Sequence, residues 1–153
     1  MAGCRRDARP EHAVTESAPA PRLLAAVAAG GALGALARWG LTAAFPSSTD
    51  AFPWATFGIN VSGAFVLALL PAFAAVRRSR VLAVGLGPGV LGGYTTLSAY
   101  SEQTRALLGH GETVTAGCYL LGTLAACLVA VAVADHWSTL QQRRVFADEG
   151  GDE

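Results

Sequence analysis

The sequence predicts an all-α integral membrane protein with four transmembrane helices. Hydrophobic residues make up 52% of the 153-residue chain and charged residues only 14%, where soluble proteins average roughly 25% charged residues. The charges lie mainly outside the apolar stretches, in the first 22 residues, at 77–80 and from Asp135 onward. The apolar stretches also lack the polar face, repeating every 3.6 residues, that a soluble helix bundle shows. The formal net charge of zero gives no sign of a nucleic-acid partner.

Each of the four apolar stretches is long enough to cross a bilayer, which takes about 20 helical residues. They are residues 23–45, 55–76, 81–108 and 113–134. The connections between them, 46–54, 77–80 and 109–112, are short. We therefore expect neighbouring helices to run antiparallel, with their backbone polar groups paired internally as lipid requires.

The two ends of the chain are polar. We expect residues 1–21 to form a disordered cytoplasmic tail, 22–137 the four-helix transmembrane domain, and 138–153 a polar C-terminal tail. The first 21 residues have no apolar core followed by a small-residue cleavage site, so we do not expect a cleavable signal peptide.

The arginines predict the orientation in the membrane. All 11 basic residues are Arg, and nine of them fall on one side of a four-helix topology. These nine are Arg5, Arg6, Arg9, Arg22, Arg77, Arg78, Arg80, Arg143 and Arg144. Only Arg38 and Arg105 are candidates for the other side. Because basic residues stay cytoplasmic, we expect a multi-pass protein of the plasma membrane with both termini in the cytoplasm.

The third apolar stretch predicts a helix that is broken at its centre. The segment Gly92–Gly93–Tyr94–Thr95–Thr96–Leu97–Ser98 joins two glycines to two β-branched residues, which makes a poor helix interior. Irregular backbone at membrane depth is tolerated where protein buries it or where it lines a cavity. A break also frees carbonyl groups, which can coordinate a cation such as Na⁺.

Polar side chains within the other stretches are candidates for a pathway. Asn60 is either a hydrogen bond between helices or part of a pathway lining. Arg38 either extends to the interface or provides positive potential at an anion entrance. Tyr119, Thr123 and Cys127 are spaced by four residues and share one helix face, so their polar groups could pass a small anion along. No nucleophile–base pair or metal-ligand cluster predicts an enzyme.

Three segments resemble the CrcB/Fluc family of fluoride channels. They are GGALGALARWGL at 30–41, TFGINVSGAF at 56–65 and GGYTTLSAYS at 92–101. Their order and spacing match the family in a four-helix chain of this length, and the resemblance extends from about residue 24 to 137. The function that it implies is passive export of fluoride, which lowers fluoride in the cytoplasm and confers resistance to it.

The resemblance also implies an assembly and a set of sites. Members are antiparallel dimers with two fluoride pathways and one central structural Na⁺ on the dimer axis. The Na⁺ ligands would be backbone oxygens of Gly92 and Thr95. The residues that carry over to the fluoride pathway are Asn60, Tyr119 and Thr123. We also place Ser98 and Tyr100 in the pathway and Arg38 at the anion entrance.

This chain departs from the family pattern at several positions. Leu97 and Tyr100 stand where the family has two Phe, whose electropositive edges can favour an anion. Gln103 stands where a Glu is common, and Cys127 where a hydroxyl residue is usual. These departures and the one-sided Arg distribution lead to the hypothesis of a heterodimer with an oppositely oriented paralogue, beside the alternative of a homodimer.

Two other functions remain open from the sequence. A small proton-coupled multidrug exporter would need an acidic residue inside a helix, and Glu102 is the candidate. A non-conducting partner subunit of a heterodimeric channel would have the same fold without its own transport. Cation export by Glu102 variants and fluoride efflux from liposomes would separate these possibilities.

Overall fold

The computed structural model describes residues 20–149, and the side chains of residues 20–139. It confirms the four helices that are long and apolar enough to cross a membrane. Helix α1 covers Pro21–Ala44, and α2 covers Trp54–Leu69 and ends in the 3₁₀ turn η1, Leu70–Ala72. The third span runs from Arg80 to Gly109, and the fourth lies in α7, Thr113–Glu149.

The third span is bent, as the sequence predicts, and consists of four segments. They are α4 (Arg80–Val84), the π-helical η2 (Gly85–Leu91), α5 (Gly92–Tyr94) and α6 (Leu97–Gly109). Pro88 lies inside η2 and has no N–H to donate, which fits the wider π-helical turn. Thr95 and Thr96 are extended, with ψ angles of 159° and 113°, so the helix stops after Tyr94 and restarts at Leu97.

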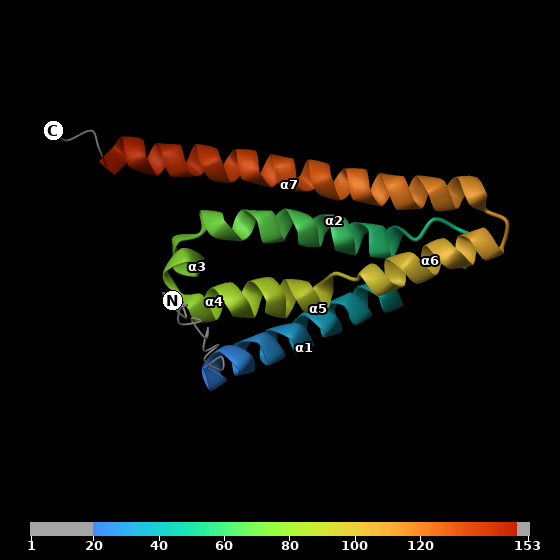
Figure 1. Cartoon of the computed structure of the whole chain (residues 1–153), viewed down its shortest axis with the longest axis horizontal. Coiled ribbons are helices and arrows are strands. Elements are labelled where there is room, and N and C mark those ends of the chain that lie inside the picture. Colours follow the sequence, from blue (N-terminus) through green and yellow to red (C-terminus); the bar gives the residue numbers. More distant parts are fainter. Residues whose placement is uncertain (1–19, 150–153) are drawn as a thin grey trace, which may run out of the picture.

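The helices lie side by side in the order α7, α2, third span and α1 (Figure 1). The first half of the third span packs along α1, whereas α6, beyond the break, packs against α7. Helices α2 and α7 also pack along each other. The break therefore lets one span contact a different neighbour at each end.

Glycines bring α1 and the third span into backbone contact. A Cβ added to Gly30 would overlap the carbonyl oxygen of Gly85, and one added to Gly34 would overlap that of Val90. A Cβ on Gly93 would in turn overlap the carbonyl oxygen of Gly31. These helices approach so closely only because small residues line the contact.

The connection between the second and third spans is longer than the sequence predicts. It begins after Ala72 and contains the short helix α3, Ala74–Arg78. Arg77 Nη1 donates to the carbonyl oxygens of Pro71 at 2.8 Å and Ala72 at 3.0 Å, which satisfies acceptors that the end of a helix leaves unpaired. Ser79 caps α4 by accepting from Leu82 N–H.

The structure describes the two polar ends of the chain only in part. Helix α7 continues through Ser138 to Glu149, so the predicted C-terminal tail is largely an extension of the fourth helix. Residues 1–19 of the predicted N-terminal tail lie outside the described residues.

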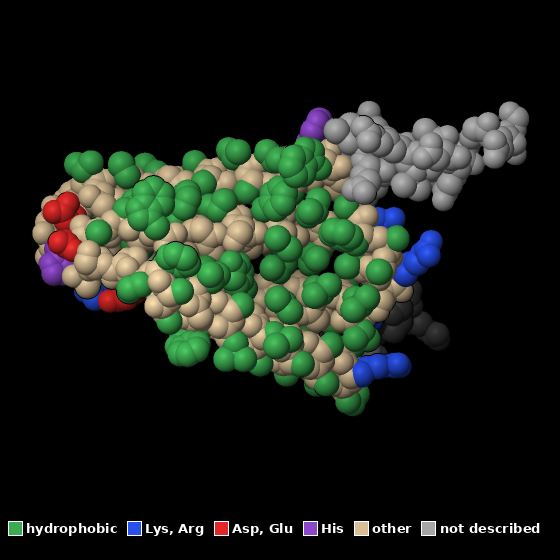
Figure 2. Space-filling model, turned by 180° about the vertical axis from the view of Figure 1, so that it is seen from behind, with side chains coloured by type: hydrophobic (Ala, Val, Ile, Leu, Met, Phe, Trp, Pro, Cys, Tyr) green, Lys and Arg blue, Asp and Glu red, His purple; other side chains and the backbone are tan. Residues whose placement is uncertain are grey.

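The surface is apolar along the helices and charged at their ends (Figure 2). Exposed side chains along the flanks include Leu33, Leu36, Trp39, Leu121 and Leu128. Blue Arg side chains gather near the start of α1, and red acidic side chains gather at the opposite end. This distribution is that of a protein whose flanks face lipid and whose ends face water.

Candidate ion pathway

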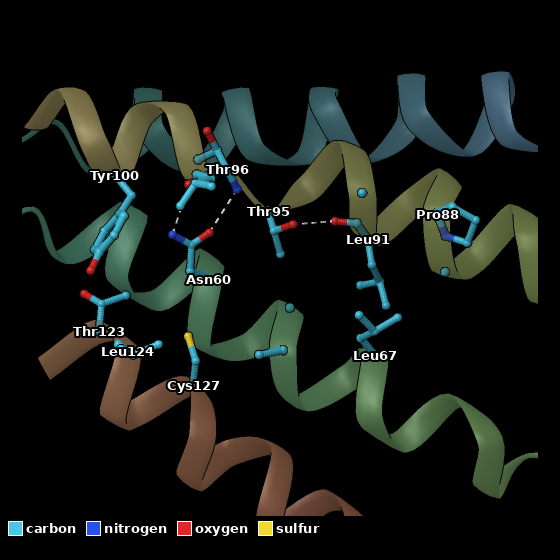
Figure 3. A pocket seen from close by; sticks show the side chains of 15 residues that line it. Asn60, Leu67, Pro88, Leu91, Thr95, Thr96, Tyr100, Thr123, Leu124 and Cys127 are labelled. Atoms are coloured by element: carbon cyan, nitrogen blue, oxygen red, sulfur yellow. Dashed lines mark hydrogen bonds between the residues drawn. The ribbon is translucent and has the colours of Figure 1, made fainter. Parts of the chain in front are cut away.

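The break in the third span is held by the side chain of Asn60 on α2. Thr96 N–H donates to Asn60 Oδ1 at 2.9 Å, and Asn60 Nδ2 donates to the carbonyl oxygen of Thr96 at 3.2 Å. Figure 3 shows both hydrogen bonds. The amide thus satisfies both backbone groups of a residue that cannot pair within a helix. The structure therefore shows Asn60 in hydrogen bonds between helices, and its role in a pathway stays a prediction.

At the break, two backbone N–H groups donate to side-chain oxygens instead of to the carbonyl groups that they would meet in a helix. In a continuous α-helix, Thr96 N–H would bond to Gly92 C=O and Ala99 N–H to Thr95 C=O. Instead, Thr96 N–H donates to Asn60, and Ala99 N–H donates to Thr96 Oγ1 at 3.1 Å. The carbonyls of Gly92 and Thr95, the two predicted Na⁺ ligands, are therefore without their helical donors.

An open groove of about 620 Å³ runs between α2, the third span and α7. Its lining combines polar groups at the break with apolar side chains along α2 and α7. The lining residues include Asn60, Gly63, Leu67, Pro88, Leu91, Gly92, Thr95, Thr96, Leu97, Tyr100, Thr123, Leu124 and Cys127. The groove is thus a mainly apolar passage with a few polar groups concentrated at one level.

Thr123 is the α7 residue whose hydroxyl lies nearest to the polar groups at the break. Its side chain is only 3% exposed, and its Oγ1 has no hydrogen-bond partner among the residues that the structure describes. In Figure 3, Thr123 and Cys127 point from α7 toward Tyr100 and Asn60. A buried hydroxyl without a partner is costly and is able to donate a hydrogen bond to a ligand in the groove.

Aromatic rings close the groove beyond Thr123. Tyr119 is fully buried, its ring packs against Phe52 and Tyr100, and its hydroxyl donates to Gln103 Oε1 at 2.8 Å. The Tyr100 hydroxyl donates to the carbonyl oxygen of Leu120. Both tyrosines therefore tie α6 to α7, and Tyr119 lies behind the groove rather than on its lining.

The comparisons with known proteins agree with this architecture. Residues 25–134 match the family of CrcB-like proteins, described as Camphor Resistance (CrcB). This matched segment contains every residue of the groove and all of the four apolar stretches except residues 23 and 24. The chain belongs to this family.

The relatives of this CrcB-like chain include named fluoride channels. It is 39% identical over 129 residues to fluoride-specific ion channel FluC 2 of Nocardia farcinica, covering 81% of this chain and 92% of that protein. It is also 42% identical over 105 residues to FluC of Paracoccus denitrificans, covering 69% of this chain and 85% of the relative. Channels of this family are transporters and not enzymes.

The groove of the CrcB-like chain gathers most of the predicted site residues. It brings together Asn60, Gly92, Thr95, Tyr100 and Thr123. Leu97, at one of the usual Phe positions, is 76% exposed at the groove margin.

Besides Tyr119, two other predicted residues lie off the groove. Ser98 is exposed and pairs its hydroxyl with Thr96 Oγ1 at 3.2 Å. Arg38 is half-buried on α1 and does not line the groove, and its Nε has no partner among the described residues. The pathway roles of Ser98 and Arg38 therefore remain predictions from the sequence.

The sequence interpretation missed two threonines of the CrcB-like chain. Thr96 supplies the backbone groups that Asn60 binds, and its hydroxyl caps α6. Thr56 is 1% exposed, one helical turn before Asn60. The spacing of four residues between Thr56 and Asn60 places both on one face, and that spacing was a usable signal.

The acidic residue that an exporter would need lies elsewhere. Glu102 is exposed on α6, and its Oε2 accepts from Arg105 Nε at 3.0 Å. It does not line the groove. An exposed and paired carboxylate gives no support to a proton-coupled exporter.

Proposed function

We propose that this chain is a subunit of a fluoride channel that exports fluoride passively across the plasma membrane and lowers its cytoplasmic concentration. The observation that carries this proposal is the buried, unpartnered Thr123 hydroxyl, which faces the level of Asn60 in the groove of a CrcB-like chain. The names of the relatives, fluoride-specific ion channels, support the choice of anion.

The groove offers what a small, strongly hydrated anion requires. A channel must replace water around the ion with fixed donors at close spacing. Thr123 Oγ1 and the second N–H of Asn60 Nδ2 are such donors, because the first N–H of this amide is bonded to Thr96. The positive ring edge of Tyr100 adds a weak attraction for an anion. We assign Tyr119 to the same pathway, next to Tyr100.

We further propose that two oppositely oriented subunits close the groove. The groove is open in a single chain, and a Cβ added to Gly92 would meet nothing within 4 Å. Open apolar surface around a polar break suits a second copy or a related paralogue. Such a partner would cover Gly92 and the exposed Leu97.

The residues at the break fit a structural Na⁺. The described residues contain no group of three or more His, Cys, Asp or Glu that could hold a metal, whereas Gly92 and Thr95 present carbonyl oxygens without their helical donors. Hard cations prefer such neutral oxygen ligands at a break in a membrane helix. The ion would neutralise these carbonyl dipoles and fix the break.

A pair of substitutions tests the dimer and its Na⁺ together. Thr95→Ala keeps the carbonyl, so we expect nearly normal fluoride efflux and a normal dimer. The Cβ of Gly92→Leu would meet nothing within 4 Å in its own chain. We therefore expect a folded monomer that fails to dimerise and conducts at least about tenfold less fluoride. Size-exclusion chromatography with light scattering measures the dimer. A normal Gly92→Leu dimer would contradict the proposal.

The function itself is tested with purified protein in liposomes loaded with potassium fluoride. Valinomycin provides the counter-current, and a fluoride electrode records efflux, with chloride-loaded liposomes as the selectivity control. We expect fluoride efflux without chloride efflux. A silent protein that becomes active only with a co-expressed paralogue would identify a partner subunit in a heterodimer.

Subunit orientation distinguishes the two kinds of dimer. Among the described residues, Arg22, Arg77, Arg78 and Arg80 lie at the water-facing end of the molecule where α1 and α4 begin. We therefore expect one orientation with cytoplasmic termini. Tags at both ends, mapped for sidedness in cells, measure this. Mixed orientation with full efflux from the chain alone would favour a homodimer over a heterodimer.

A further inference from the structure

A second hollow lies far from the groove, where α1 begins and α3 meets α4. Its volume is about 420 Å³, and three of its seven lining residues are arginines. Arg22 comes from the first turn of α1, Arg78 from the end of α3 and Arg80 from the start of α4. Two separate parts of the chain therefore place like charges around one space.

These three arginines differ from their neighbour Arg77. Arg77 is bonded to the backbone carbonyls of Pro71 and Ala72, so it has a structural role. Among the described residues, no hydrogen bond or ion pair involves the guanidinium group of Arg22, Arg78 or Arg80. Like charges around one hollow repel each other, and an anion between them removes this repulsion.

The surroundings of the hollow point to an amphiphilic anion. Val81 lines it and is 37% exposed, while the neighbouring Leu24 and Leu82 are 55% and 43% exposed. These side chains belong to α1 and α4, whose flanks face lipid. A charged hollow that continues into apolar surface suits a headgroup with acyl chains attached. Guanidinium groups bind phosphate oxygens in paired hydrogen bonds.

We infer that Arg22, Arg78 and Arg80 form a binding site for the phosphate headgroup of an anionic phospholipid at one membrane interface. Basic pockets between transmembrane helices on the cytoplasmic side bind such headgroups. The Ser79 hydroxyl also lines the hollow. It accepts from Leu82 N–H and keeps its own proton for donation to a phosphate oxygen. The lipid would bridge α1 to the α3–α4 connection.

Native mass spectrometry of the detergent-solubilised full chain tests this site. The probes are phosphatidylglycerol and phosphatidylcholine with identical acyl chains. Because the arginines also affect the orientation of the chain in a membrane, lipid binding is measured in detergent, where orientation has no influence. We expect preferential retention of phosphatidylglycerol, and about fivefold weaker binding for each of Arg22→Gln, Arg78→Gln and Arg80→Gln. Arg77→Gln and Arg105→Gln are the matched controls and should bind as the unmodified protein does.

Four outcomes would overturn the inference. Equal retention of both lipids would remove headgroup recognition, and equal loss in the control variants would reduce the effect to total charge. Competition by glycerol 3-phosphate at the same concentration as the lipid would identify a site for soluble phosphate. Stronger phosphatidylglycerol binding after removal of residues 2–18 would identify that segment, which carries Asp7, Glu11 and Glu16, as the occupant.

Discussion

The third span packs against α1 before its break and against α7 after it, with α2 joined to the break by Asn60, and these contacts differ in kind. Toward α1, glycines press backbone against backbone, with no room for a Cβ at Gly30, Gly34 or Gly93. Toward α2 and α7, polar side chains make the connections, through Asn60 and the two tyrosines. Close packing of glycines thus specifies the position of the third span before its break, and side-chain hydrogen bonds specify it at the break and beyond.

This difference matters for transport. A contact between two backbones has few alternative arrangements and leaves no space for an ion. A contact between polar side chains can exchange partners with an ion at small cost, since donors are already present in the groove. We therefore expect substitutions in the glycine contact to damage folding, and substitutions in the polar contact to damage conduction.

The largest expected effect is at Gly34. Gly34→Val places side-chain atoms on the carbonyl of Val90, and we expect a loss of at least about 3 kcal/mol of stability or no folded protein. Gly40→Val, on the same helix, meets nothing within 4 Å and is the control. Thermal unfolding in detergent measures both. Equal melting temperatures would show that the close α1 contact is not required.

Asn60→Asp is expected to impair conduction most among the polar positions. The carboxylate repels fluoride and cannot donate to the carbonyl of Thr96, although it still accepts from Thr96 N–H. We expect fluoride efflux to fall at least about tenfold while the protein still inserts. Ser62→Ala is the control, because Ser62 lies on the same helix outside the groove lining. Normal efflux from Asn60→Asp would remove Asn60 from the pathway.

Thr123→Val separates conduction from stability. Valine keeps the shape and removes the unpartnered hydroxyl, so we expect about tenfold slower efflux with unchanged or slightly higher stability. Thr123→Ser should restore efflux. Thr104→Val is the reverse control, since the Thr104 hydroxyl is bonded to the carbonyl of Tyr100 at 2.8 Å and does not line the groove. Loss of stability without loss of efflux in Thr123→Val would contradict the assignment.

The smallest expected effect is that of Tyr100→Phe. The ring stays in the groove, and the hydrogen bond to Leu120 is lost, which costs about 1 kcal/mol. We expect efflux within about twofold of the unmodified protein. A large loss would show that the Tyr100 hydroxyl itself contacts the ion.

The sequence predicts the spans and the break because both depend on local composition. Four long apolar stretches and the Gly92–Thr96 segment have no other stable arrangement in lipid. The connection around Pro71 and the π-helical turn around Pro88 were not predicted. Each depends on how one proline is accommodated by neighbouring carbonyls, which the residue pattern does not encode.

The site was predicted less completely for a related reason. Asn60, Thr123 and the Gly92 and Thr95 carbonyls lie together because three separate helices meet at the break. Ser98 is one of the first residues of α6 and lies outside the groove lining. Asn60 bonds to the backbone of Thr96. Because every residue except proline has the same backbone groups, the residue type at position 96 does not reveal this contact. Helical spacing alone cannot show which side chain meets it.

The Asn60 amide has a consequence for the tolerance of this chain to substitution. Its side chain acts as a detached peptide group, offering one acceptor and one donor to the two backbone groups of Thr96. Among neutral side chains, only the amides of Asn and Gln present a donor and an acceptor side by side on one carbon, and Gln is longer by one methylene. In a complete mutational scan selected for growth in fluoride, position 60 should therefore accept fewer residue types than any position on the lipid-facing flanks.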